Sequence, residues 1–297
     1  MPDVIIVGGG AAGLTAGIYC THSGFDVLLI EAGALGGQIA TAGTIENYPG
    51  ILTNGAELSG QITTQAEQAG VKILHGAATH IDLQNKLVTV NGEQLRSSCI
   101  ILATGASPRK LGLPLETELI GRGVSYCATC DGRLFKNRTV AVVGGGNSAV
   151  SEALELAVIC KEVHLIFRKP SLRAEAHLRA QISKAGIILH PSSQVAQLHA
   201  ADRLQAVSVQ TDDKTKYLPV DGLFIAIGRE PQSRVIQGQL ATDEYGYVLA
   251  GEDTKTPIAG VFIAGDVRKK ALRQIVTAAS DGAIAAYQAI SYLNEIS

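Results

Sequence analysis

The segment from Cys127 to Gly132, with the sequence CATCDG, carries the most distinctive chemistry in this chain. Two cysteines separated by two residues can form a disulfide. The thiolate of one can then attack another disulfide while the second cysteine resolves the mixed disulfide. A carboxylate beside the pair disfavours a thiolate, so Asp131 fits a proton carrier better than an activator of Cys130. The alternative for Asp131 is an ordinary turn residue before Gly132.

The alternative for the cysteine pair is half of a zinc site. A second pair of cysteines or a pair of histidines at zinc spacing does not accompany it, which disfavours that alternative. Five cysteines are an odd number for a chain of 297 residues, which indicates a reducing compartment with one working pair rather than a secreted disulfide framework. We expect the other three, Cys20, Cys99 and Cys160, to be inert residues of the core or of helices.

A glycine-rich turn follows the predicted strand Val4–Val7. Gly8, Gly10 and Gly13 occupy the G-x-G-x-x-G positions that allow a tight turn, the approach of a phosphate and close helix–strand packing. The helix that follows directs its free N–H groups toward an anion. Glu31 ends the next predicted strand, about 20 residues beyond the glycines, where a carboxylate binds ribose hydroxyls. The pattern predicts a dinucleotide site, and the alternative is a tight turn without a ligand.

The same opening is repeated in the middle of the chain. The predicted strand Thr139–Val143 leads into Gly144, Gly146 and Ala149 and then into a helix. The position equivalent to Glu31 is Phe167, so this second site lacks the ribose-binding acid. A basic cluster follows instead, made of Arg168, Lys169 and Arg173. Such a cluster holds a 2′-phosphate, which predicts NADP(H) here; the alternative is an ordinary solvated charge run.

The remaining pattern is that of an α/β protein. Apolar residues make up 46% of the chain, aromatic residues only 4%, and there are 33 glycines, as expected for many tight strand–helix turns. We expect helices at 14–23, 56–69, 149–159, 174–184 and 275–293. We expect strands at 4–7, 27–30, 99–103, 139–143, 163–167, 187–190, 195–200, 206–210, 216–220, 223–227 and 261–264. The strands at 72–74, 80–83, 87–90 and 94–96 are expected to form a small antiparallel insertion.

Length and charge exclude several classes of protein. The chain is long enough for two domains. Lys and Arg number 25 against 27 Asp and Glu, and the net charge of −2 gives no general attraction to nucleic acid or membranes. No apolar stretch reaches the ~18 residues that a membrane span needs. Because the first strand begins almost at Met1, we expect no cleavable signal and a cytoplasmic protein.

Several further segments complete the pattern: the loops Gly36-Gly37-Gln38 and Glu46-Asn47, the segment Ala103–Ala106, and Gly265-Asp266 followed by Arg273-Gln274. Together with the CATCDG hexapeptide and the two glycine fingerprints, they resemble the low-molecular-weight thioredoxin reductases. The resemblance covers essentially the whole chain, and the hexapeptide in this context is its most specific part.

The resemblance implies two Rossmann-like nucleotide-binding domains of the three-layer ββα type. Residues 1–112 and 236–297 would form an FAD domain, with a linker at Gly112-Leu113-Pro114. Residues 113–235 would form an inserted NADPH domain that carries the redox pair. Members of this family are homodimers whose NADPH domain rotates relative to the FAD domain, and their disulfide substrate is thioredoxin. Cys130 resembles the flavin-side cysteine, Cys127 the one that attacks thioredoxin, and Asp131 the acid that moves a proton.

The resemblance also implies which residues bind the cofactors. For FAD they are Gly8, Gly10, Ala12, Gly13, Glu31, Gly36, Gly37, Gln38, Asn47, Ala78, Thr104, Gly105, Gly265, Asp266, Arg273, Gln274 and Ile275. For NADPH they are Gly144, Gly146, Asn147, Ser148, Ala149, Arg168, Lys169 and Arg173. No metal ligand is implied.

Two departures from the family pattern fall in the NADPH site. Phe167 and Lys169 stand where the family has His and Arg, and lysine is only a point charge for a phosphate. Ser151 replaces the first of two acids, and Glu152 remains. The electron donor is therefore the least secure part of the interpretation, and a protein donor such as ferredoxin is the alternative to NADPH. A hypothesis of another class is a non-catalytic flavoprotein that senses redox state through Cys127 and Cys130.

Overall fold

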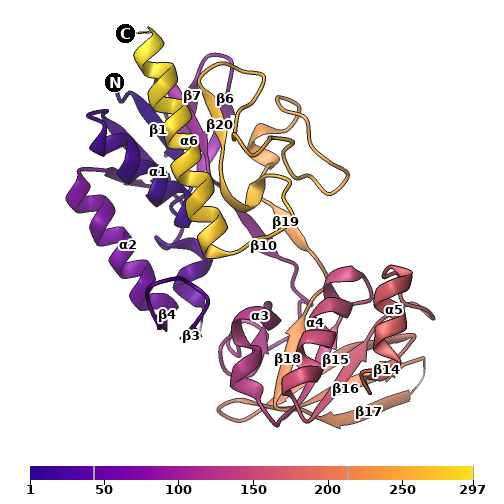
Figure 1. Ribbon diagram of the computed structural model, residues 1–297. Coiled ribbons are helices and arrows are strands. Elements are labelled where there is room, and N and C mark those ends of the chain that lie inside the picture. Colours follow the sequence, from indigo (N-terminus) through magenta and orange to yellow (C-terminus); the bar gives the residue numbers. More distant parts are fainter. Residues whose placement is uncertain (43, 213, 297) are drawn as a thin grey trace. The chain divides into compact units, whose positions relative to one another are not determined.

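The computed structural model describes residues 1–42, 44–212 and 214–296. It divides into two compact units, drawn in Figure 1. Unit 1 consists of Met1–Ser107 and Glu230–Ser297, and unit 2 consists of Pro108–Arg229. Unit 2 is thus inserted in the chain between the two segments of unit 1. Ser297, the last residue of the predicted third segment, lies outside the described residues.

Unit 1 is built on a parallel sheet in the strand order β20-β9-β1-β2-β5. Its strands are β1 (Val4–Val7), β2 (Val27–Glu31), β5 (Lys72–His75), β9 (Cys99–Leu102) and β20 (Val261–Ile263). Its helices are α1 (Ala11–His22), α2 (Gly55–Ala69) and α6 (Ile275–Ile296), with short 3₁₀ helices η1 (Gly37–Thr41), η3 (Arg234–Ile236) and η4 (Gly265–Val267). An antiparallel sheet comprises β6 (Ala78–Asp82), β7 (Leu87–Val90) and β8 (Glu93–Arg96), and β3 (Thr44–Ile45) pairs with β4 (Thr53–Asn54).

These elements form three layers. The parallel strands are apolar on both faces because both faces are covered, as buried parallel sheets require. Val4 and Ile6 point into a core shared with α1 and α6, which lie side by side (Figure 1). Ile5 and Val7 point into a second core shared with Ile81 and Val88 of the antiparallel sheet and with other residues. The first strand is therefore fixed between a helical layer and a β layer, which holds the glycine turn at its carboxyl end.

Unit 2 repeats this plan. Its parallel sheet has the order β11-β18-β12-β13-β14. Those strands are β11 (Val124–Ser125), β12 (Thr139–Val143), β13 (Glu162–Ile166), β14 (Ile188–His190) and β18 (Gly222–Ile225). The antiparallel layer is β15 (Ser193–Ala200), β16 (Leu204–Thr211) and β17 (Lys214–Pro219). The helices are α3 (Ala128–Asp131), α4 (Asn147–Ile159) and α5 (Ala176–Ile182), with the 3₁₀ helix η2 (Gly132–Phe135).

Alternate side chains of β12 pack into two different cores of unit 2. Val140 and Val142 pack with α4, whereas Ala141 and Val143 pack with the antiparallel layer. The predicted α/β fold with two Rossmann-like parallel sheets is confirmed by this topology. Among the described residues, no helix is both long and apolar enough to cross a membrane.

The chain passes from one unit to the other a few residues before each predicted domain boundary. Chain segments β10 (Ala106–Pro108) and β19 (Arg229–Pro231) pair with each other there. The predicted linker at 112–114 instead folds within unit 2. The carboxylate of Glu116, 1% exposed, accepts the N–H groups of Leu111 (2.9 Å), Gly112 (2.8 Å) and Leu113 (3.2 Å), which fixes this segment.

One prediction about the insertion was wrong. The strand predicted at 72–74 was assigned to the antiparallel sheet, but β5 is the edge strand of the parallel sheet. Leu28 to Glu31 of β2 pair in parallel with Lys72 to His75. The chain reaches that edge through α2, which is the helical crossover that a parallel pair needs. In the described part of the chain, this antiparallel sheet consists of β6, β7 and β8.

Candidate active site

Cys127 and Cys130 form a disulfide, with their Cα atoms 5.3 Å apart. Cys127 is the N-cap of α3 and Cys130 lies within this short helix, which Tyr126 and Cys127 join to β11. The Cys130 N–H donates to the sulfur of Cys127 (3.2 Å), and the Asp131 N–H donates to the Cys127 carbonyl (3.1 Å). Both cysteines are half-buried. A short helical turn thus holds the two cysteines of the predicted redox pair in a disulfide.

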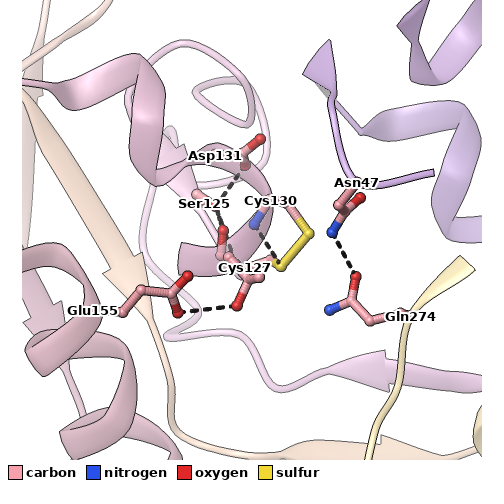
Figure 2. Close-up of a disulfide and its surroundings, with 8 residues drawn as sticks. Asn47, Ser125, Cys127, Cys130, Asp131, Glu155 and Gln274 are labelled. Carbon is pink, nitrogen blue, oxygen red and sulfur yellow. Dashed lines mark hydrogen bonds between the residues drawn. A yellow bond between two sulfur atoms is a disulfide. The ribbon is translucent and has the colours of Figure 1, made fainter. Parts of the chain in front are cut away.

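Asp131 lies next to this disulfide and bonds to a residue that the sequence analysis missed. The Ser125 hydroxyl donates to an Asp131 carboxylate oxygen (2.6 Å) and also accepts the Cys127 N–H (3.1 Å), as Figure 2 shows. Burial raises the pKa of Asp131, and the Ser125 hydrogen bond opposes that rise only in part. The carboxyl therefore retains a proton more readily than an exposed one. A hydroxyl two residues before the first cysteine was the only sequence signal for Ser125.

The first glycine turn is tied to the parallel sheet. At Gly8 the backbone is left-handed (φ 110°), and an added Cβ would overlap the Ala103 carbonyl at the end of β9. Both carboxylate oxygens of Glu31 accept backbone N–H groups, from Gly9 (2.5 Å) and Gly33 (2.7 Å). Glu31 therefore joins the end of β2 to the glycine turn.

The other predicted FAD residues lie on several separate segments of unit 1. Gly36 bridges to Gly10, and Gln38 donates to the Ala106 carbonyl (2.5 Å). Asn47 donates to Gln274 (3.0 Å; Figure 2), two residues that are 227 positions apart in sequence. The remaining positions are distributed as follows: Ala12 and Gly13 in α1, Gly37 in η1, Thr104 and Gly105 after β9, Gly265 and Asp266 in η4, Arg273 before α6, and Ile275 at its start.

Ala78 follows the end of β5, where the N–H of Gly76 donates to the carbonyl of Glu31 (2.9 Å). It begins β6 and packs, partly buried, against the core between the parallel and antiparallel sheets. No hydrogen bond joins its backbone to the glycine turn in the part of the chain that the structure describes.

Two features of unit 1 fit a bound dinucleotide. An added Cβ at Gly10 or at Gly105 would meet no atom within 4 Å, so there is open space beside both backbones. Among the described residues, Asp266 Oδ1 and Arg273 Nε are buried and find no hydrogen-bond partner, although Lys270 Nζ lies 3.6 Å from Asp266 Oδ1. Buried polar atoms are normally satisfied, so these two atoms are candidates for ligand contacts.

A buried charge cluster holds the η4 turn that contains Asp266. The sequence did not reveal this cluster. Asp281 of α6 is 3% exposed, and its carboxylate accepts the N–H of Gly265 (2.9 Å), which begins η4. It also accepts two bonds from Arg268 (both 2.8 Å) and one from Lys270 (3.1 Å). Burial alone would raise the pKa of Asp281, but the hydrogen bonds and charges of Arg268 and Lys270 lower it below its usual value. Asp281 thus anchors the η4 turn to α6.

The second glycine turn is built in the same way in unit 2. Gly144 has a left-handed backbone (φ 144°), and an added Cβ would overlap the Ala226 carbonyl at the end of β18. Gly146 precedes the first residue of α4, and an added Cβ there would meet nothing within 4 Å. The Asn147 side chain exchanges hydrogen bonds with Glu175, at 2.8 Å through its amide and at 2.9 Å through its oxygen. Ser148 and Ala149 continue the first turn of α4.

The basic cluster lies beside this turn. Arg168 and Lys169 follow β13. The side chains of Arg168, Lys169 and Arg173 are exposed. The Arg173 N–H donates to the Gly145 carbonyl (2.7 Å), which brings its backbone onto the glycine turn. Phe167 is buried (4% exposed) and packs into the core of unit 2, so it contributes no polar group to a phosphate site.

The other three cysteines lie outside the site. Cys20 and Cys99 are fully buried, and burial raises the pKa of both thiols, that of Cys20 to about 12. Burial also raises the pKa of Cys160, half-buried at the end of α4, to about 11. High thiol pKa values make all three poor nucleophiles at neutral pH.

Comparison with known proteins settles the family. The model of the pyridine nucleotide-disulphide oxidoreductase family matches residues 2–282. The chain belongs to this family, and within it to the low-molecular-weight thioredoxin reductases. A thioredoxin reductase of Listeria innocua serovar 6a is 40% identical over 99% of this chain and 94% of its own length. One of Escherichia coli O157:H7 is 39% identical, over 98% and 96%. The crystal structure of thioredoxin reductase from Streptococcus pyogenes matches 99% of both chains with a TM-score of 0.94 and 35% identity.

The predicted resemblance and enzyme class are therefore confirmed. The chain is an enzyme of the thioredoxin reductase class with a redox-active disulfide, Cys127–Cys130. The hypothesis of a non-catalytic redox sensor is not supported by these comparisons. The assignments of individual cofactor-binding residues stay predictions.

Proposed function

We propose that this enzyme uses NADPH and bound FAD to reduce its Cys127–Cys130 disulfide, and that the resulting dithiol reduces a thioredoxin. The observation that carries the proposal is the disulfide in a CxxC turn beside a partly buried acid, on a chain with two separate glycine-turn sites. FAD, when bound, would relay an electron pair from the nicotinamide to the disulfide.

Unit 1 supports the FAD assignment through its own residues. The glycine turn and the N-terminus of α1 would bind the pyrophosphate, and Glu31 would accept a ribose hydroxyl in competition with its present backbone donors. Asp266 and Arg273 would find ligand partners for their unpartnered atoms. Gln38, Asn47 and Gln274 would line the remaining part of the site.

Unit 2 supports NADPH as the substrate that supplies electrons. The N-terminus of α4 would bind its pyrophosphate, and Arg168, Lys169 and Arg173 would bind the 2′-phosphate. The buried Phe167 favours a second candidate, a protein donor such as ferredoxin, because it leaves that phosphate site with fewer polar groups.

The dithiol chemistry follows from the α3 turn. Reduction of the disulfide takes two electrons and two protons, and the raised pKa of Asp131 allows its carboxyl to hold one of those protons beside the thiols. The Cys127 thiolate would attack the thioredoxin disulfide, forming a mixed disulfide and releasing one thioredoxin thiol. The Cys130 thiol would then break that bond, restoring Cys127–Cys130 and releasing the second thioredoxin thiol.

By analogy with the family we also propose a homodimer in the cytoplasm, whose reducing conditions suit the three free cysteines. Light scattering of the purified protein tests the dimer, and a monomer at micromolar concentration would contradict it.

Anaerobic stopped-flow mixing of the FAD-loaded enzyme with NADPH tests the donor. The proposal expects the flavin absorbance to bleach with NADPH and much more slowly with NADH, which lacks the 2′-phosphate. A flavin that bleaches with reduced ferredoxin but not with millimolar NADPH would replace NADPH by the protein donor.

A further inference from the structure

Helix α4 reaches back to the redox turn with two carboxylates. Glu152 and Glu155 are three residues apart and therefore lie on neighbouring parts of one helix face. Glu155 accepts the Thr129 hydroxyl (3.0 Å), and Glu152 accepts the N–H of Ala128. Ala128 and Thr129 are the two residues between the cysteines. The helix that follows the second glycine turn thus binds the middle of the CxxC motif directly.

The contact between α3 and α4 is close. Ala128 is 2% exposed and belongs to the core that α4 covers. At Gly132 an added Cβ would lie 3.0 Å from Leu156 and 3.2 Å from Ile159, both on α4. Little room remains between the two elements, so a change of charge on the facing side of α4 acts on the redox turn with little solvent screening.

The Glu152 carboxyl is poorly satisfied in its present place. Although Glu152 accepts the Ala128 N–H, its Oε2 is buried and has no hydrogen-bond partner in the part of the chain that the structure describes. An ionised carboxylate with a bare oxygen is costly to bury, whereas a protonated carboxyl is less so. Burial raises the pKa of Glu152 to about 7, and the charge of Glu155 adds to the rise, while the Ala128 N–H and the charge of Arg229 oppose it.

We propose that Glu152 is a positioning residue for the dithiol. Protonated Glu152 anchors Ala128 and permits a thiolate at the cysteine pair, whereas ionised Glu152 opposes a thiolate there. The Ala128 N–H belongs to the peptide bond that joins Ala128 to Cys127, so a negative charge on Glu152 lies close to any negative charge on that thiol. Two such charges disfavour each other, and the effect is reciprocal: a thiolate would raise the pKa of Glu152 as much as ionised Glu152 raises the pKa of the thiol.

Other charged and titratable groups lie on α4 and on the elements around it. Glu155 lies on the same helix, Arg229 acts from β19, and Asp131 lies on α3. Elements β13, α5 and η2 also contact α4. On β13 the titratable groups are Glu162 and His164, which bond to each other. On α5 they are His177 and Arg179, with Glu175 just before the helix, and on η2 the group is Arg133.

The experiment follows the ionisation of the reduced pair. FAD-loaded enzyme is reduced with a phosphine, and the rate of iodoacetamide alkylation at Cys127 is measured by mass spectrometry from about pH 5 to about pH 10. The wild type should show an inflection near pH 7 in addition to the thiol's own. Glu152→Gln keeps an acceptor for Ala128 but carries no charge, so this inflection should disappear and alkylation at neutral pH should rise several-fold. Because no NADPH or thioredoxin is added, this test stands even if the proposed donor or partner is wrong, although it rests on the dithiol being the reacting group.

Glu155→Gln is the matched control. It removes a charge from the same helix face, so the inflection should remain and move to lower pH, because Glu155 raises the pKa of Glu152. A Glu152→Gln profile that superimposes on the wild type, or a Glu155→Gln variant that abolishes the inflection, would overturn the proposal.

A measurement on the unaltered protein covers the case in which Glu152→Gln folds poorly. The carboxyl ¹³C resonance of Glu152 is titrated in the disulfide form and in the reduced form. The proposal requires a higher pKa of Glu152 in the reduced form at pH values where the thiolate is present. Equal pKa values in the two forms would refute it, because a purely structural Glu152 would not respond to the redox state.

Discussion

Asp281 provides the sharpest test of how the η4 turn is held in place. Its carboxylate binds the Gly265 N–H and the buried side chains of Arg268 and Lys270, which are 3% and 4% exposed. Arg268 also binds a second carboxylate, Glu252, at 3.1 Å, but Glu252 is 87% exposed. One arginine therefore bonds to both a buried and an exposed acid, and the two can be compared directly.

The expected magnitudes differ because of solvent. Replacing Asp281 by Ala removes the buried carboxylate that Arg268 and Lys270 share, which costs roughly 3–5 kcal/mol of unfolding free energy. For a unit of this size the midpoint should fall by roughly 2–4 °C for each kcal/mol. Replacing Glu252 by Gln removes an exposed ion pair, which contributes only about 0–1 kcal/mol.

Scanning calorimetry of the FAD-free enzyme measures the stability, and flavin fluorescence on titration measures FAD affinity. We expect Asp281→Ala to lower the unit 1 transition by roughly 6–20 °C and to weaken FAD binding, whereas Glu252→Gln changes neither appreciably. Asp281→Asn, which keeps the shape, should fall between them. Equal effects of Asp281→Ala and Glu252→Gln would refute the role of the buried cluster.

Three other predictions concern backbone strain and pH. Leu115 is 39% exposed with φ 67°, so Leu115→Gly should raise the unfolding free energy by about 1 kcal/mol in guanidinium titrations; a loss would contradict the strain. Gly144→Ala should cost roughly 2 kcal/mol or more in the same titrations because of the Ala226 carbonyl, whereas Gly146→Ala should cost less than about 1 kcal/mol; equal costs would count against this account. Burial lowers the pKa of His190, helped by the charges of His164 and Lys216, so the unfolded chain binds this proton more tightly and stability should fall as the pH drops below 6.5. His190→Asn should flatten that dependence, and an unchanged slope would exclude His190.

The sequence predicted the parts of the fold whose signals are local. Strand Val4–Val7 and strand Thr139–Val143 were placed to the residue because apolar runs ending in glycine turns occur within a few positions. The sheet assignment of Lys72–His75 was wrong because a four-residue strand does not indicate its partner. Helix α3 was not predicted, since four residues are too few for a helical periodicity.

The site was predictable where a motif carried it and was missed where contacts are made over long distances in sequence. Cys127, Cys130 and Asp131 belong to one hexapeptide, and their grouping was expected. Asp281 accepts a hydrogen bond from Gly265, which lies 16 positions away in the sequence, and no local sequence pattern indicates that bond. The hydrogen bond from Ala128 to Glu152 depends in the same way on how α3 packs on α4, which only the folded chain shows.

The most direct test of the central claim follows the two cysteines during a single reaction cycle. FAD-loaded enzyme receives one equivalent of NADPH without oxygen and then one equivalent of oxidised thioredoxin, and alkylation at Cys127 and Cys130 is read after each addition. The account predicts that both thiols become alkylatable after NADPH and that both are protected again after thioredoxin. If NADPH and thioredoxin were consumed while Cys127 and Cys130 stayed oxidised throughout, or if Cys130→Ser enzyme kept full turnover, the central claim would be wrong.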